Sequence, residues 1–122
     1  MNRGDVYYAE LGATNNGSVI NGNRPVVIIQ NDIGNRYSPV VIVAPMTTKR
    51  KTKHLPTHVL LLKEKAKWLY RDSTILTEQI FTVSKEQISH KMGHLSPEDM
   101  ARLDIALAAS LALPRGAERS VV

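Results

Sequence analysis

Apolar residues in the first two thirds of the chain fall into short runs rich in β-branched side chains, with polar turns between them. Runs of this length and composition predict β-strands. The clearest run, residues 26–30, has four successive β-branched apolar residues before Gln30, without alternation, as expected of a strand that is buried on both faces. The predicted strands cover residues 5–11, 26–30, 40–46, 57–62 and 73–83.

The segments between these strands are polar and of unequal length. Residues 12–23 hold three Gly and four Asn, which favour turns and positive φ, and they predict a long loop. Residues 31–39 predict a turn-rich connection, and residues 48–54 a basic loop. Residues 64–69 predict a short turn of helix, and Ser84 with Gln87 has the spacing that caps a single helical turn.

The hydrophobic period changes near the C-terminus. Ser96 and Pro97 match an N-cap followed by proline at the first helical position, and acidic residues come next. Apolar residues then repeat at intervals of three, four and four, at Met100, Leu103, Leu107 and Leu111. Pro114 ends the pattern. We therefore expect a mainly β (α+β) single domain over residues 1–113, a small curled barrel of about five to seven strands with a long C-terminal helix. Residues 114–122 are interpreted as a disordered tail or a remnant of cloning.

Composition limits the chemistry available to this chain of 122 residues. It has no cysteine, so disulfides, thiolate nucleophiles and cysteine-ligated zinc are excluded. The N-terminus lacks the apolar segment of a secretory signal, and every apolar run is shorter than the ~18 residues that cross a bilayer. We expect a soluble, cytoplasmic protein that needs no membrane.

The net charge of +5 is unevenly distributed. Residues 47–71 contain eight Lys or Arg and one acid, Glu64, which gives +7 for this segment and −2 for the rest. Five residues at its start are candidates for binding a polyanion: Thr48, Lys49, Arg50, Lys51 and Lys53. The alternative is a solvent-exposed loop whose lysines serve solubility.

One arginine and one threonine pair suggest a catalytic centre. Arg24 heads the run of residues 24–32, just before the predicted strand 26–30, and the predicted strand 40–46 leads directly into Thr47 and Thr48. Neighbouring strands can bring the guanidinium and the hydroxyl to one rim of the sheet. Such a pair suits the phosphorane that forms when RNA is cut by its own 2′-hydroxyl. The simpler interpretation makes Arg24 a surface residue and Thr47 a β-branched strand residue.

Six segments, in order, resemble the MazF/PemK (Kid-like) family of toxin endoribonucleases. The segments are Arg3-Gly4-Asp5-Val6-Tyr7, Gly22-Asn23-Arg24-Pro25-Val26, Gln30-Asn31-Asp32, the strand end at Thr47, Leu55-Pro56-Thr57-His58, and Arg71-Asp72-Ser73 leading to Glu78-Gln79-Ile80. The resemblance covers roughly residues 3–113. It implies an SH3-like barrel, a homodimer, and cleavage of single-stranded mRNA at short sequences without a metal or cofactor, leaving a 5′-hydroxyl. It also implies a cognate antitoxin that occupies the RNA groove.

The same resemblance implies roles for individual residues. Arg24 and Thr47 correspond to the catalytic pair, and Ser18, Ser73 and Gln79 to substrate contacts. Ser73 and Gln79 would lie on one face of the predicted strand 73–83. Two positions depart from the family pattern and affect the expected base preference: Val19, a further candidate contact, replaces an acid, and Phe81 replaces an Arg.

Other functions would use some of the same residues. A histidine-based ribonuclease would use His58, although a structural histidine is commoner in a strand. His54 and His58, like His90 and His94, are four residues apart, but no HExxH motif supports a metal site. An RNA- or ribosome-binding barrel without catalysis would also explain the basic segment. A gyrase-poisoning toxin of related fold is disfavoured by the Arg-Pro strand start and the Arg-Asp-Ser segment.

Overall fold

The computed structural model describes residues 1–13, 17, 19–48 and 55–114. Within these ranges the chain is mainly β, with seven strands, two α-helices and two short 3-10 turns. The strands are β1 (Asp5–Glu10), β2 (Asn23–Ile28), β3 (Val40–Thr47), β4 (His58–Leu61), β5 (Ser73–Leu76), β6 (Phe81–Ser84) and β7 (Ile88–His94). The helices are α1 (Asp32–Tyr37) and α2 (Pro97–Leu111), and the 3-10 turns are η1 (Lys63–Lys65) and η2 (Lys85–Gln87). No helix in these ranges is long and apolar enough to cross a membrane.

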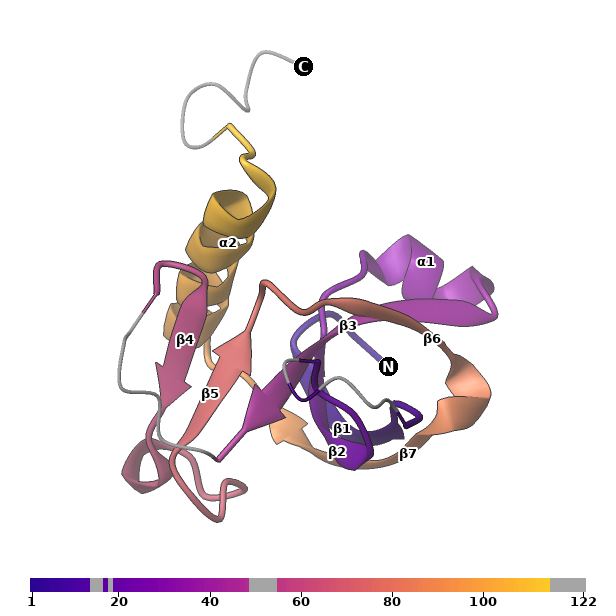
Figure 1. The fold of residues 1–122 in the computed structure, drawn as a ribbon, viewed down its shortest axis with the longest axis horizontal. Helices are drawn as coiled ribbons and strands as arrows, with labels where there is room; N and C mark the ends of the chain where they lie inside the picture. Colours follow the sequence, from indigo (N-terminus) through magenta and orange to yellow (C-terminus); the bar gives the residue numbers. More distant parts are fainter. Residues whose placement is uncertain (14–16, 18, 49–54, 115–122) are drawn as a thin grey trace.

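The long strand β3 organises an antiparallel sheet. One edge of β3 pairs with β2, whereas the other edge pairs with β6 through its first half and with β5 through its end. Strand β1 pairs with both β2 and β7, and β7 follows β6 through η2. Strands β3, β2, β1, β7 and β6 therefore curl into a ring, while β5 and β4 extend beside α2 (Figure 1). The predicted mainly β domain with a barrel-like sheet and a terminal helix is confirmed.

Two hydrophobic cores lie on the two faces of this sheet. Val26 and Ile28 belong to the core inside the ring, with Val41, Val43 and Val83. Val27, between them on β2, belongs to the core that also includes residues of α2, β4 and β5. Neighbouring residues of a strand point to opposite faces, so β2 is buried on both sides, as its uninterrupted apolar run predicts.

The terminal helix forms where its capping sequence predicts. The Oγ of Ser96 accepts a hydrogen bond from the backbone N–H of Asp99, and Pro97 occupies the first turn. The helix ends at Leu111, and Ala112 follows in the left-handed conformation with φ of 56°. The predicted helical turn at 84–87 is also confirmed, because Ser84 and Gln87 form a capping box.

Three predicted elements were wrong, and one strand was missed. Residues 73–83 are two strands, since β5 ends at Leu76 and β6 begins at Phe81. The connection 31–39 contains α1, whose N-cap Asn31 accepts a hydrogen bond from the N–H of Gly34. Strand β7 was not predicted, and the turn expected at 64–69 is the shorter η1.

Candidate active site

Arg24 is the second residue of β2 and lies where the preceding loop joins the ring. Its Nε donates to the carbonyl oxygen of Asn21 at 2.9 Å, and its Nη1 donates to the carbonyl oxygen of Met46 at 3.4 Å. A guanidinium carries more N–H donors than these two bonds use. Two backbone carbonyls thus hold a half-buried cation at the end of β3, and its charge and planar donor set suit an anion.

Thr47 is the last residue of β3 and directly follows Met46. Its exposed fraction is 5%, and it lies opposite Thr74 of β5. Val26 lies opposite Pro45, so the same β2–β3 register, continued by two residues, places Arg24 opposite Thr47. Opposite residues of an antiparallel pair have their side chains on the same face of the sheet. Arg24 and Thr47 therefore share one face and one end of the sheet, and their chemical roles remain predictions.

This arrangement suits the binding of an anion with five oxygens around phosphorus. A guanidinium presents a planar set of donors that binds two phosphate oxygens at once. A hydroxyl beside it adds a further donor to the same oxygens. Donors that are already held in place stabilise charge developing in a transition state more than mobile ones do.

Most of the predicted RNA contacts around this pair lie outside the described residues. Among them are Ser18 and the four cations of the basic segment, Lys49, Arg50, Lys51 and Lys53. Thr48 is exposed and directly follows Thr47, so the basic segment begins at the Thr47 end of β3. Val19, in the loop before β2, is 41% exposed.

Ser73 does not share a face with the Arg24–Thr47 pair. It precedes Thr74, the residue opposite Thr47, and neighbours along a strand point to opposite faces. Its side chain is buried, and its Oγ donates to the carbonyl oxygen of Arg71 at 2.9 Å. The expectation that Ser73 and Gln79 share one strand was wrong, because β5 ends at Leu76 and Gln79 lies in the turn beyond it.

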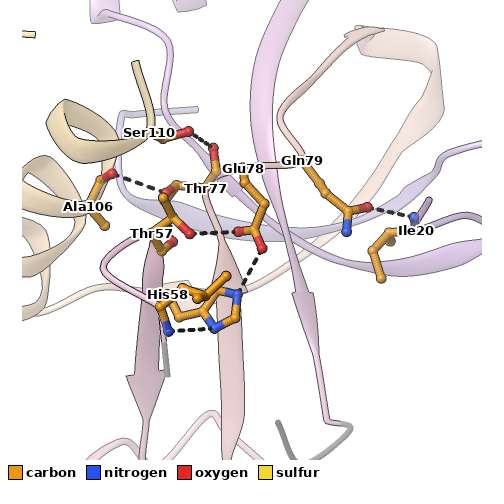
Figure 2. A network of polar contacts seen from close by, with 9 residues as sticks. Ile20, Thr57, His58, Thr77, Glu78, Gln79, Ala106 and Ser110 are labelled. Carbon is orange, nitrogen blue, oxygen red and sulfur yellow. Dashed lines mark hydrogen bonds and ion pairs between the residues drawn. The ribbon is translucent and has the colours of Figure 1, made fainter. Parts of the chain in front are cut away.

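Gln79 instead contacts the loop before Arg24. Its Oε1 accepts a hydrogen bond of 2.7 Å from the backbone N–H of Ile20 (Figure 2). Ile20 precedes Asn21, whose carbonyl oxygen holds the Nε of Arg24. Sequence reasoning missed both loop residues, because a contact made by backbone atoms leaves no signal in the side chains.

A shallow pocket lies on the Ser73 face of the sheet, beside Thr48. Its volume is about 280 Å³, and its lining includes Tyr8, Pro25, Tyr70 and Arg71. We call it the tyrosine pocket. Tyr70 is 84% exposed, and Tyr8 lies against the ring of His90 with centroids 4.8 Å apart. Exposed aromatic rings beside a cation are the groups on which single-stranded nucleic acids stack.

The described histidines take part in contacts within the protein. The Nε2 of His58, whose side chain is 5% exposed, lies 2.8 Å from a carboxylate oxygen of Glu78. Burial raises the pKa of Glu78, but hydrogen bonds from its own backbone N–H and from His58 outweigh burial and lower it. These contacts favour the structural interpretation of His58. His54 lies outside the described residues, and in the described ranges no cluster of His, Cys, Asp or Glu could hold a metal ion.

Comparisons with known proteins agree on one family. Residues 2–111 match the family described as PemK-like, MazF-like toxin of type II toxin-antitoxin system. Endoribonuclease EndoA of Bacillus subtilis (strain 168) is 49% identical over 113 residues, which are 93% of this chain and 96% of that protein.

Solved structures show the same fold. A mycobacterial endoribonuclease in complex with its cognate antitoxin superposes with a TM-score of 0.77 at 28% identity, covering 95% of this chain and 99% of that one. MazF from Deinococcus radiodurans has a TM-score of 0.75 over 92% of this chain and 96% of its own. Its identity is 15%, so this second likeness concerns the fold alone.

Proposed function

The chain belongs to the family of PemK-like, MazF-like toxins of type II toxin-antitoxin systems, and we propose that it cuts single-stranded mRNA at short sequences without a metal ion. It is an endoribonuclease, like its relatives. The observation that supports the proposed mechanism is the hydrogen bond from the Nη1 of Arg24 to the carbonyl oxygen of Met46, the residue before Thr47.

The proposed reaction uses the RNA's own 2′-hydroxyl as nucleophile. The 2′-hydroxyl gives up its proton to a base as its oxygen bonds to the adjacent phosphorus. The bond from phosphorus to the 5′-oxygen breaks, and that oxygen takes up a proton and leaves as a 5′-hydroxyl. A 2′,3′-cyclic phosphate remains on the other fragment. After the attack and before the 5′-oxygen leaves, negative charge builds up on the phosphorane oxygens. The guanidinium of Arg24 and the hydroxyl of Thr47 stabilise this charge.

The remaining RNA contacts follow from the position of this pair. Thr48 and the cations Lys49, Arg50, Lys51 and Lys53 continue the chain from Thr47, so they bind the phosphates flanking the cleavage point. Ser18 and Val19 lie in the loop that leads to Arg24, and Ser73 lies in the tyrosine pocket. Through its amide group, Gln79 contacts a base near the cleaved bond.

Two protein partners complete the proposal. A cognate antitoxin inhibits the enzyme by occupying the RNA groove, and the relative solved with its cognate antitoxin supports this partner. A second copy of the chain forms a homodimer. Exposed apolar residues in and just after α2, Ile105, Leu111 and Leu113, support a protein contact there. Such an enzyme acts in the cytoplasm, where mRNA is found.

The deciding experiment is incubation of the purified protein with a long single-stranded RNA in EDTA, followed by mapping of the cut ends. We expect discrete cuts at one short sequence, each with a 5′-hydroxyl. RNA that is bound but left intact would favour a non-catalytic RNA-binding barrel. Cleavage that depends on an added divalent cation would contradict the metal-free mechanism.

A further inference from the structure

Hydrogen bonds from two parts of the fold hold the turn between β5 and β6, residues 77–80, in place. Thr77 is fully buried, and its Oγ1 lies 2.6 Å from the carbonyl oxygen of Thr57 and 3.2 Å from that of Ala106 in α2. The Oγ of Ser110 donates to the carbonyl oxygen of Thr77 at 2.8 Å. Figure 2 shows these contacts converging on the turn from α2 and from the start of β4.

The next residue of the turn is held as well. Glu78 accepts a hydrogen bond from the Oγ1 of Thr57 at 3.2 Å and pairs with the Nε2 of His58 at 2.8 Å. Thr77 also donates its backbone N–H to Thr57 at 3.1 Å. Side-chain and backbone contacts from two elements thus fix the position of the residue that follows, Gln79.

Gln79 connects this well-held turn to the loop that precedes Arg24. Its Oε1 accepts from the N–H of Ile20 at 2.7 Å, and the next carbonyl along the loop, that of Asn21, accepts from the Nε of Arg24 at 2.9 Å. The contact between Gln79 and Ile20 spans 59 positions of sequence. This side-chain hydrogen bond therefore ties the stretch of loop before Arg24 to a distant and well-held part of the fold.

From these contacts we infer that the side-chain carbonyl of Gln79 is a positioning group for Arg24, acting through the backbone of Ile20 and Asn21. This role rests on the proposed function and is separate from any contact of Gln79 with RNA. An arginine side chain has several rotatable bonds. Its guanidinium therefore stays in one position only if the carbonyl oxygens that accept its hydrogen bonds also stay in position. A displacement of about 1 Å at a catalytic group can slow a reaction about 10²-fold.

Two substitutions separate positioning from RNA contact. Gln79→Met has a similar shape and removes the acceptor for Ile20, whereas Gln79→Glu keeps an acceptor oxygen and adds a negative charge. With saturating RNA, we expect kcat to fall at least about tenfold in Gln79→Met and to stay within about threefold of wild type in Gln79→Glu. The added charge repels RNA, so KM rises in Gln79→Glu.

Gln87→Met is the matched control. The Oε1 of Gln87 also accepts a backbone N–H, that of Ser84, at 2.8 Å, and its Nε2 donates to the carbonyl oxygen of Glu10 at 2.7 Å, so the substitution removes contacts of the same kind without touching Ile20 or Asn21. We expect this substitution to lower thermal stability slightly and to leave kcat unchanged. A fall in kcat equal to that of Gln79→Met would mean that any loss of this kind of bond slows the enzyme, and would overturn the specific role of Gln79.

Hydrogen exchange gives a readout that does not depend on activity. The amide of Ile20 should exchange faster in Gln79→Met than in wild type and Gln79→Glu. Unchanged exchange at Ile20, or a Gln79→Met enzyme with normal kcat and raised KM, would leave Gln79 as an RNA contact alone. A wild-type protein that fails to cut RNA would overturn the proposed function itself, and the positioning role with it.

Discussion

The carboxylate of Asp5, the first residue of β1, lies 2.6 Å from the Nδ1 of His94, the last residue of β7. Lys91 of β7 approaches the same oxygen at 3.3 Å, and the backbone N–H of Asn2 donates to the other oxygen at 2.8 Å. Asp5 is 2% exposed, so its charge is buried at the seam where β7 joins β1 and completes the ring. The seam is therefore held by charge as well as by backbone hydrogen bonds.

We predict that Asp5→Asn destabilises the fold in a pH-dependent manner. Burial raises the pKa of Asp5, but hydrogen bonds from Asn2, His94 and Lys91 outweigh it, and the pKa lies below its ordinary value of 3.8. A lowered carboxyl pKa contributes stability that is complete above the unfolded value and is lost as pH falls through the folded value. Urea unfolding should show a loss of about 1.5–3 kcal/mol at pH 7. An equal loss at pH 7 and near pH 2 would show that the charge of Asp5 contributes nothing.

We predict that Arg24→Ala lowers cleavage of single-stranded RNA about 10²-fold or more, as expected for loss of a preorganised donor. Single-turnover kinetics measures the effect. Arg36→Ala, which removes an exposed arginine from the last turn of α1, is the control and should cut RNA normally. Wild-type activity in Arg24→Ala would remove this residue from the mechanism.

We predict that Gly93→Ala is destabilising because Trp68 occupies the space of a Cβ there. The indole ring packs directly over Gly93 of β7, so an added methyl group must push it away. Trp68 thus anchors the segment after η1 against β7. Thermal or urea unfolding should show a loss of about 1–3 kcal/mol. Gly17→Ala meets no atom within 4 Å and serves as the control. The cost of Gly93→Ala should largely disappear in a Trp68→Ala background, and an undiminished cost there would point to a backbone cause.

We predict that Tyr70→Ala weakens RNA binding through the tyrosine pocket. Stacking of a base on an aromatic ring contributes about 1–3 kcal/mol, so KM should rise while kcat changes little. Tyr37 on α1 is also largely exposed, at 76% against 84% for Tyr70, and it does not line the pocket. Equal effects of Tyr37→Ala and Tyr70→Ala on KM would mean that the pocket has no special part in binding RNA.

The parts of the fold that could be predicted are those with local signals. Strand β2 is indicated by an unbroken β-branched run, and α2 by Ser96, Pro97 and a regular apolar period. Strand β7 carries exposed His and Lys side chains and pairs with β1 through an irregular register, so its place is set by its partner. The division of residues 73–83 into two strands is also set by strand pairing, because β5 and β6 pair with different halves of β3.

In the candidate site too, some features have local sequence signals and others do not. Arg24 and Thr47 could be paired from sequence because each lies at the end of a recognisable strand. The contact between Gln79 and Ile20 could not, since it joins a side chain to a backbone N–H across two irregular segments. Side chains that position a catalytic group through the main chain are visible only in the folded structure.

The last prediction concerns the basic segment at the end of β3. Replacing Lys49, Arg50, Lys51 and Lys53 by Gln should weaken RNA binding, since each bound phosphate releases counterions from the strand. The slope of log Kobs against log salt should become shallower by about 0.7 for every phosphate that is no longer neutralised. Fluorescence anisotropy with labelled RNA measures this, in an Arg24→Ala background in which cleavage is expected to be slow. Arg36→Gln with Arg102→Gln removes exposed charges from α1 and α2 and should leave the slope unchanged. A slope that stays at the wild-type value after all four replacements would show that the segment does not bind RNA.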